Sequence, residues 1–386
     1  MIAGWKEYTV ADVISTVIDY RGKTPKKLGG DWSDSGYRAL SAKNIKMGKI
    51  VQLDSIRYVS EEMYRCWMKE EVQKGDILIT SEAPFGQIYY WDSDEKIVLS
   101  QRLFAVRVNE SFYPKYIYFY MTSSFFQAEL DGRATGTTVV GLRQPELLKC
   151  KIFAPEYQEQ KRIADILWCL EQKVNNNEAI NENLLQQAQA IFKDRFLINV
   201  DMPDNWKCMT LGDVSEMSAG GDKPKIISNQ KTEECQYPIY ANGISDEGLY
   251  GFTTHYKISA ESVTVSARGT IGFVCLRHLP YTPIVRLVTL VPHQSIISAQ
   301  YLFLWLKSIP IHGTGTTQQQ LTVPDFRKTE IIIPTKAEMI AFTETVAPLF
   351  QQMWSNQDEN AKLAELRNAL LPRLMSGELD VSDIDI

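Results

Sequence analysis

The segment YQEQKRIADILWCLEQKVNNNEAINENLLQQAQAIFKDRF, residues 157–196, decides how the rest of this chain is arranged. It contains neither glycine nor proline, so nothing in it interrupts a helix. Its core positions recur every seven residues, at Ile163, Leu170, Asn177, Leu184 and Ile191. This spacing is typical of a coiled coil. At 1.5 Å per residue, such a helix spans roughly 60 Å. We predict a long spacer helix within residues 157–200.

A second segment of the same kind lies within residues 336–386, which we predict to hold another long helix and a C-terminal tail. It has no glycine from Lys336 to Met375, although Pro348 is expected to bend the helix or delay its start. Each core position follows its counterpart in the first segment by 179 residues, which gives Phe342, Leu349, Asn356, Leu363 and Leu370.

The central core residue of both segments is asparagine, Asn177 and Asn356. An asparagine in a coiled-coil core costs stability but fixes the register of the partners. We predict that the helices pair antiparallel with these two residues face to face, and that leucine at both positions raises the melting temperature. The alternative is that each helix packs separately on its own domain. A helix of this length has more apolar surface than a domain of modest size can cover, which favours pairing.

The sequence outside these two helical segments is also duplicated. GTTVVGLRQPEL (136–147) returns as GTTQQQLTVPDF (315–326), GWKEYTVADV (4–13) as NWKCMTLGDV (205–214), and GDILITSEAPFGQI (75–88) as ESVTVSARGTIGFV (261–274). The offset is constant from Gly136 onward and drifts before it. Each repeat is therefore a variable domain, 1–156 or 201–335, followed by a helix of fixed length. The turn-rich DMPDNW (201–206) joins the repeats.

The variable domains have the pattern of a mixed α/β fold. Alternating or β-branched runs predict strands at 76–80, 102–108, 262–266 and 286–291. Residues 114–130, which begin with proline and carry apolar residues three and four apart, predict one helix. We expect α/β (mixed α+β) domains with a strongly bent sheet.

Composition narrows the function classes. The net charge is −6, but residues 1–150 carry +1 and residues 331–386 carry −5, so the domains can still present basic faces to nucleic acid. The six cysteines are scattered and no secretory signal is visible, which favours reduced thiols and a cytoplasmic location. The four histidines lack metal-ligand spacing, and no P-loop or Asp/Asn-Pro-Pro-aromatic adenine motif is present. We therefore expect no metal, cofactor or catalytic site on this chain.

Two similar but non-identical domains held apart by a rigid rod suit a long repetitive target, of which duplex DNA is the obvious one. We call the repeated segment at residues 136–147 and 315–326 the frame. Its two copies differ in the middle, where one reads VVGLRQ and the other QQQLTV. That difference predicts two short, different base sequences separated by unread bases.

Four sequence motifs resemble, in their order and spacing, those of the specificity subunits of type I restriction–modification systems. They are W…LGDV at Trp206–Val214, GTT…L…P at Gly136–Pro145, P…Q…Q.RIA.IL at Pro155–Leu167 and LL…LMSGEL at Leu370–Leu379. The resemblance covers essentially the whole chain. The second helix entry, PTKAEMIAFTE (334–344), departs from the family form by lacking Gln-Lys-Arg.

The resemblance implies two target-recognition domains separated by two long antiparallel coiled-coil helices. It implies a non-catalytic reader of a bipartite, asymmetric double-stranded DNA target within a phage-defence system. Two modification subunits, which methylate adenine with S-adenosylmethionine, and restriction subunits, which cleave unmodified DNA with ATP and Mg, are the implied partners and hold those cofactors.

DNA readers place Arg and Lys at phosphates, and Arg, Asn and Gln at base edges. Such residues gather in YRGKTPKK (20–27), SAKNIKMGK (41–49), GGDKPK (220–225) and the two copies of the frame. Solvated surface loops are the alternative for each. The predicted DNA-binding residues are Arg21, Lys23, Lys26, Lys27, Lys43, Asn44, Lys46, Arg133, Thr137, Thr138, Arg143, Lys223, Lys225, Arg268, Thr316, Thr317, Gln318, Gln319 and Gln320, with Glu82 as a further strand-end candidate.

Two other classes of protein remain open. A coiled-coil scaffold that holds two partners apart without reading DNA accounts for the rod and the acidity, but not for a frame that varies inside. An enzyme with duplicated lobes is disfavoured by the missing motifs. On the helices, Gln160, Arg162, Gln187 and Gln189 are placed on outer faces that could dock the modification subunits, with a solvated face as the alternative.

Overall fold

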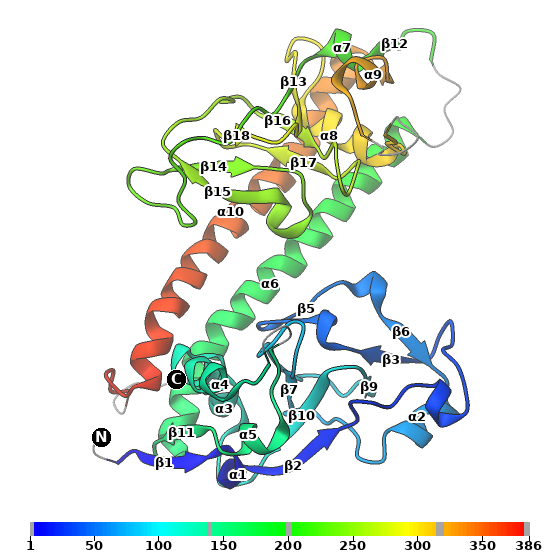
Figure 1. Cartoon of the computed structure of the whole chain (residues 1–386). Helices are drawn as coiled ribbons and strands as arrows, with labels where there is room; N and C mark the ends of the chain where they lie inside the picture. Colours follow the sequence, from blue (N-terminus) through cyan, green and yellow to red (C-terminus); the bar gives the residue numbers. More distant parts are fainter. Residues whose placement is uncertain (1–3, 137–139, 198–202, 314–319, 382–386) are drawn as a thin grey trace. The chain divides into compact units, whose positions relative to one another are not determined.

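The computed structural model describes residues 4–136, 140–197, 203–313 and 320–381. The chain forms two compact units, of which unit 1 comprises Met1–Asn177 and Asp358–Ile386, and unit 2 comprises Glu178–Gln357. The long helices α6 (Tyr157–Phe196) and α10 (Lys336–Met375) each contribute one half to each unit. The mixed α/β class and the paired long helices are confirmed (Figure 1).

Unit 1 is built on a four-stranded antiparallel sheet in the order β2-β10-β7-β8. A three-stranded sheet, β6-β3-β9, shares a hydrophobic core with it. Two further two-stranded sheets are formed by β1 with β11 and by β4 with β5. The strands are β1 Lys6–Thr9, β2 Ile14–Asp19, β3 Tyr37–Leu40, β4 Ile45–Lys46, β5 Lys49–Ile50, β6 Arg57–Val59, β7 Ile77–Thr80, β8 Ile88–Tyr90, β9 Ile97–Leu99, β10 Leu103–Val108 and β11 Lys151–Ala154. The helices of this domain are α1 Val10–Val13, α2 Glu61–Trp67, α3 Pro114–Thr122, α4 Ser124–Arg133 and α5 Gln144–Leu148.

Unit 2 repeats the two main sheets and the outer strand pair of this topology, without a counterpart of β4–β5 among its described residues. Its sheets run β13-β19-β16-β17 and β15-β14-β18, and β12 pairs with β20. The parallel pairing of two named strands, β3 with β9 or β14 with β18, also recurs. Its elements are β12 Lys207–Thr210, α7 Leu211–Val214, β13 Ser215–Ala219, β14 Tyr237–Tyr240, β15 Leu249–Thr253, β16 Ser262–Val265, β17 Val274–Arg277, β18 Thr282–Pro283, β19 Val288–Pro292, α8 Ala299–Ser308, α9 Val323–Phe326 and β20 Glu330–Ile333.

The repeated opening of each domain has a physical reason. Thr9 and Asp12 form a capping box on α1, and Thr210 and Asp213 form the same box on α7. The hydrogen bonds from each threonine hold the pKa of its aspartate below the usual value. The residue pair is therefore repeated because it starts the same helical turn twice.

The tryptophan of each opening ties its domain to the long helix that follows it. Trp206 Nε1 donates to Glu338 Oε2 at 3.0 Å in the first turn of α10. In unit 1, burial raises the pKa of Glu159, and a hydrogen bond from Trp5 counteracts this. Glu159 and Glu338 are 179 residues apart, so the same contact is used in both repeats.

The single helix predicted over 114–130 is wrong. The structure has α3 and α4, which are separated by Ser123 in an extended conformation. The Ser123 hydroxyl donates to the Tyr120 carbonyl at 2.6 Å and accepts from the Phe126 amide at 3.4 Å. One buried serine thus ends the first helix and caps the second, and apolar periodicity continues unchanged through the break.

Pro348 neither delays nor interrupts α10, which begins at Lys336 and continues to Met375. The proline lies on the exposed side of the helix. Its missing amide therefore leaves an unpaired carbonyl where water can reach it. None of the helices in the described part of the chain has the length and apolarity needed to cross a membrane.

Each domain packs on the start of its own long helix and on the end of the other. The core of unit 1 contains Ile163 and Leu167 of α6 together with Leu374 and Met375 of α10. The core of unit 2 contains Phe342 and Val346 of α10 together with Phe192 and Phe196 of α6. The helices are therefore held antiparallel by both domain cores as well as by their shared seam.

The two central asparagines are buried, as predicted, at 1% exposure for Asn177 and 5% for Asn356. They do not bond to each other, and that part of the prediction is wrong. Asn177 Nδ2 donates to Asn360 Oδ1 at 2.8 Å, and Asn356 Nδ2 donates to Asn181 Oδ1 at 2.8 Å. These are equivalent pairs under the 179-residue offset. Each asparagine reaches a partner one helical turn beyond the expected position.

This pairing changes the stability test. Replacing Asn177 and Asn360 together by leucine is expected to raise the melting temperature by roughly 2–4 °C, because an apolar contact replaces an amide pair. Replacing Asn177 alone is expected to lower it, since Asn360 Oδ1 then loses the Asn177 donor and, among the described residues, Glu359 keeps only its ion pair with Lys173. Calorimetry checks both, with the exposed Asn175 to leucine as the control. A lower melting temperature for the double variant would contradict the expectation.

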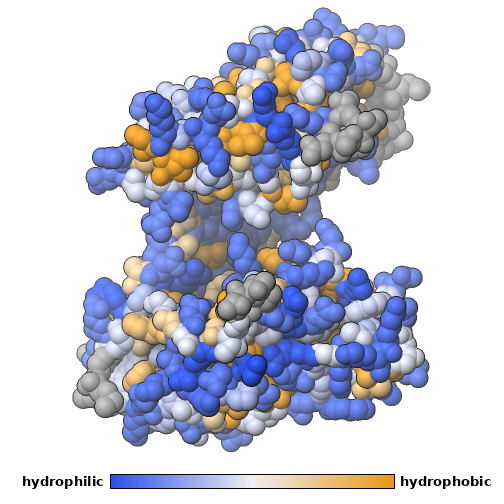
Figure 2. Space-filling model, viewed as in Figure 1, coloured by the Kyte–Doolittle hydropathy of each residue, from blue (hydrophilic) through white to orange (hydrophobic). Residues whose placement is uncertain are grey.

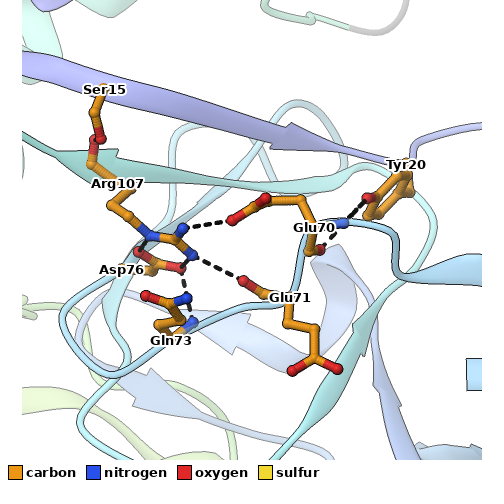
Figure 3. A network of polar contacts seen from close by, with 7 residues as sticks. All are labelled: Ser15, Tyr20, Glu70, Glu71, Gln73, Asp76 and Arg107. Carbon is orange, nitrogen blue, oxygen red and sulfur yellow. Dashed lines mark hydrogen bonds and ion pairs between the residues drawn. The ribbon is translucent and has the colours of Figure 1, made fainter. Parts of the chain in front are cut away.

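A buried ion pair holds the sheet of unit 1 to the loop before β7 (Figure 3). The Arg107 guanidinium donates to both Asp76 oxygens at 2.9 Å and to the Glu71 carbonyl at 2.8 Å, and it also pairs with Glu70. Asp76 is 1% exposed and additionally accepts from the Gln73 amide at 2.8 Å. Hydrogen bonds to Asp76 raise the pKa of Arg107, so the arginine stays charged.

Candidate nucleic-acid interface

The repeated frame docks on the same strand end in both units. Leu142 N donates to Ser81 O at 2.9 Å just after β7, and Leu321 N donates to Ala267 O at 3.0 Å just after β16. Leu142 and Leu321 are the leucines of the two frames, 179 residues apart. The frame and the loop that follows the strand, both chosen from sequence, are therefore brought together at one end of the main sheet.

In unit 1 this sheet end contains several ion pairs. Arg21 forms a bidentate pair with Asp19, with Nη2 2.6 Å from Oδ2, and its Nη1 donates to the Leu142 carbonyl at 3.3 Å. Arg102 Nε lies 3.1 Å from Glu82 Oε1. The predicted Arg21 thus fixes the frame to the end of β2, and part of its charge is already compensated.

The flanks of the unit 1 frame also carry ion pairs. Arg133 pairs with Glu129 at 2.8 Å and lies 3.7 Å from Glu146. Hydrogen bonding from Lys149, with Arg133 nearby, lowers the pKa of Glu146. Arg143 is exposed at the N-cap of α5. Of the two predicted arginines here, Arg143 is better placed to meet a phosphate.

The lysines of 20–27 divide into engaged and open side chains. Lys23 Nζ donates to the Trp67 carbonyl at 2.9 Å and lies over the Tyr20 ring. Lys27 Nζ donates to the Gly22 carbonyl at 2.8 Å but remains exposed, and Lys26 is exposed. Lys26 and Lys27 are therefore the members of this stretch that present charge to solvent.

Asn44 does not present its side chain to a ligand. It is 1% exposed, its Oδ1 accepts from the Ser41 hydroxyl at 2.8 Å, and its Nδ2 donates to Ser55 Oγ at 3.1 Å. The amide is used to close the turn between β3 and β4, so burial argues against the predicted DNA contact there. Its neighbours Lys43 and Lys46 are exposed.

In unit 2 one side-chain amide bridges the loop after β16 and the turn before β19. Asn242 Nδ2 donates to Val285 O at 2.6 Å, and its Oδ1 accepts from Ala267 N at 2.7 Å. Arg268 Nη2 donates to Gln320 Oε1 at 3.1 Å, which joins two residues predicted separately. Sequence reasoning did not single out Asn242, whose role depends on loops that are distant in the sequence meeting in the fold.

Lys223 and Lys225 are exposed on the loop after β13. Lys223 contacts the hydroxyl and ring of Tyr250. Six other predicted contacts lie outside the described residues: Thr137, Thr138, Thr316, Thr317, Gln318 and Gln319.

Two arginines that sequence reasoning missed lie at the centre of this sheet end. Arg102 and Arg286 are exposed and directly precede the apolar residues that lead into β10 and β19. Their φ angles are +63° and +66°, a conformation that residues other than glycine rarely adopt. The shared dipeptide Arg-Leu was available in the sequence, but its conformation was not.

A polar cavity of about 260 Å³ opens beside Arg102. Lys43, Arg57 and Gln101 line it together with Arg102. Of the three cations that line this cavity, Lys43 was predicted from the sequence, whereas Arg57 and Arg102 were not. The described residues contain no cluster of side chains suited to a metal ion.

The helix residues proposed for docking are not equally placed. Gln160 is 2% exposed, accepts from Tyr113 N and donates to Pro155 O, both at 2.9 Å. Its prediction as an outer-face residue is wrong, because it joins α6 to the domain. Arg162 and Gln187 are exposed. The visible face of both units is mostly hydrophilic with separate apolar patches (Figure 2).

Known proteins show the same organisation. A family model described as the type I restriction modification DNA specificity domain matches residues 2–186 and 203–363. A putative type I specificity subunit of Mycoplasma pneumoniae is 29% identical over 51% of this chain, and the match spans 54% of that protein. The MjaIX specificity subunit of Methanocaldococcus jannaschii is 24% identical over 81% of this chain and 79% of its own length.

The crystal structure of a type I restriction–modification S subunit from M. genitalium covers 96% of both chains with a TM-score of 0.59 and 16% identity. That likeness concerns the fold. Because the family model covers both repeats of the sequence, this chain belongs to the type I restriction–modification DNA specificity domain family.

Proposed function

We propose that this DNA-recognition subunit reads a bipartite, asymmetric target, with one half-site for each domain and the paired helices as the ruler between them. The observation that carries the proposal is the docking of the frame leucine, Leu142 or Leu321, on the same strand end in both units. Different side chains then occupy equivalent places, such as Glu82 and Arg268. Two different half-sites require the same backbone support in each domain, with different side chains on it to contact the bases.

The chain itself is proposed to be non-catalytic and cytoplasmic. Two modification subunits would supply adenine methylation with S-adenosylmethionine, and restriction subunits would supply ATP- and Mg-dependent cleavage. We propose the division into recognition domains 1–156 and 201–335 and spacer segments 157–200 and 336–386 on the same grounds. A scaffold that never contacts DNA is not favoured, because it needs no varied surface at the sheet ends.

Half-site reading can be tested with one frame at a time. Alanine at Thr137 and Thr138 is expected to weaken recognition of one half-site by at least about tenfold, and alanine at Gln318, Gln319 and Gln320 that of the other. Long-read mapping of methylated adenine in host DNA, with the modification subunits present, measures both. The exposed Lys69 to alanine serves as the control.

The two results are separable because each variant leaves one domain intact. Equal loss at both halves would contradict the assignment of one domain to one half-site. The proposed function also predicts a split motif in host DNA, that is, methylated adenines in two half-sites separated by an unread gap. The absence of such a motif with the unmutated chain would contradict the proposed function as a whole.

A further inference from the structure

We propose that Arg102 and Arg286 are specificity-determining residues, each reading a guanine in the half-site of its own domain. This inference rests on the proposed function, since it names the side chains that carry out the reading. Neither residue lies in the repeated frame or in the lysine-bearing loops.

The two arginines occupy the same place in the repeat. In the aligned runs RLFAVRV (102–108) and RLVTLV (286–291), each is the residue before the leucine that enters the central strand. Both have a positive φ, +63° and +66°. Arginine gains nothing locally from this sparsely populated conformation. An arginine with a positive φ occurs at the equivalent position of two domains whose contact residues differ. This recurrence indicates that the position has a function.

In unit 1 the turn is bound to both neighbouring segments. The Arg102 carbonyl accepts from Ser81 N at 2.8 Å, and the Ser81 carbonyl accepts from Leu142 N at 2.9 Å. The arginine turn, the strand-end loop and the frame are therefore one hydrogen-bonded unit. A ligand that lies on the frame also meets Arg102.

One contact orients the side chain of Arg102, and its terminal amino groups remain available to a ligand. Its Nε faces Glu82 at 3.1 Å, and the side chain remains 49% exposed. Engaging Nε fixes the plane of the guanidinium, and the two terminal amino groups remain as a pair of parallel donors.

In unit 2 the same turn is fixed by backbone and amide contacts. Arg286 N donates to Gly220 O and Val285 N donates to Gly221 O, both at 2.9 Å, which ties the turn to the loop of Lys223 and Lys225. Asn242 joins it to Ala267. The position equivalent to Glu82 is Arg268, so unit 2 concentrates positive charge where unit 1 has an ion pair.

This geometry fits base edges better than phosphates. Arginine recognises guanine through two parallel hydrogen bonds to O6 and N7, which requires a defined direction of approach. A phosphate contact needs only a charge and tolerates a flexible side chain such as lysine. A turn held in a strained conformation at both sheet ends supplies the defined direction.

Glycine substitutions separate the side chain from the fold. Glycine adopts a positive φ without strain, so Arg102→Gly and Arg286→Gly should keep the turn and the melting temperature. With the full chain and its modification subunits, methylation of the parental target is expected to fall at least about tenfold. Each variant should accept other bases at one G·C pair of one half-site only, as read by long-read mapping of methylated adenine.

Matched controls are available in the same conformation. Asp246 and Gln52 are exposed, have φ angles of +48° and +53° and lie outside the two arginine turns, so Asp246→Gly and Gln52→Gly change the backbone in the same way without removing a guanidinium. Both are expected to leave the motif unchanged. Arg102→Lys and Arg286→Lys keep the charge and are expected to stay defective, because lysine cannot form the paired contact.

The outcomes distinguish this inference from the function on which it rests. A parental split motif that the glycine variants retain at full level would overturn the inference and leave the proposed function standing. Uniform loss over all sequences that lysine restores would identify a phosphate contact and also overturn it. Absence of any split motif with the parental chain would overturn both.

Discussion

Inserting four helix-forming residues after Glu178 and four after Gln357 is expected to move adenine methylation to a target with a longer unread gap. Both half-sequences should be unchanged, while methylation at the parental spacing should fall at least about a hundredfold. Four residues add a helical rise of about 6 Å, and a DNA base pair rises about 3.4 Å. We therefore expect the gap to grow by about one to two base pairs.

The insertion points follow from the asparagine pairs. Glu178 lies between Asn177 and Asn181 on α6, and Gln357 lies between Asn356 and Asn360 on α10. Each pair, Asn177 with Asn360 and Asn181 with Asn356, stays within its own unit. Lengthening both helices by the same amount therefore leaves the register of each pair intact.

Long-read mapping of methylated adenine provides the measurement. Alanine at the exposed residues Asn175 and Asn176 is the length-neutral control and should keep the parental gap. If the insertion variant folds, by its melting curve, and still methylates at the parental spacing, the helices do not act as the ruler.

Replacing Arg107 by methionine is expected to destabilise the domain of unit 1 by about 3 kcal/mol. Among the described residues, the substitution leaves the buried Asp76 carboxylate with the Gln73 amide as its remaining hydrogen-bond donor. An uncompensated buried charge costs far more than the net gain of the intact pair. The melting temperature should fall by roughly 6–12 °C.

A double-mutant cycle separates the charge from the packing. Adding Asp76→Asn to Arg107→Met removes the unpaired charge and should recover most of the lost stability. The corresponding positions of unit 2 are Ser262 and Val291, so its sheet is an internal control. Hydrogen exchange should rise in β7 and β10 and stay unchanged in β16 and β19. Equal destabilisation by the single and double variants would contradict this explanation.

Much of the fold was predictable because its signals are periodic or repeated. The heptads predicted both long helices, and the structure places them at Tyr157–Phe196 and Lys336–Met375. Strands predicted at 76–80 and 102–108 correspond to β7 and β10. The break at Ser123 was not predictable from periodicity, since its hydroxyl contacts replace one helical turn without altering the apolar pattern.

The candidate site was less predictable. Residue type identified Arg21, Lys23 and Asn44, but each is engaged inside the chain, and Asn44 is buried. Arg102 and Arg286 were missed, because a backbone conformation leaves no mark on composition or spacing.

The sequence by itself determined that this chain is a duplicated domain and helix, because period and offset are properties of linear order. Only the tertiary structure decided that Asn177 meets Asn360 rather than Asn356. It also decided that the frame leucines dock on the strand ends. Those contacts depend on the register between segments far apart in the chain. That register is set by packing of whole helices and sheets rather than by any local signal.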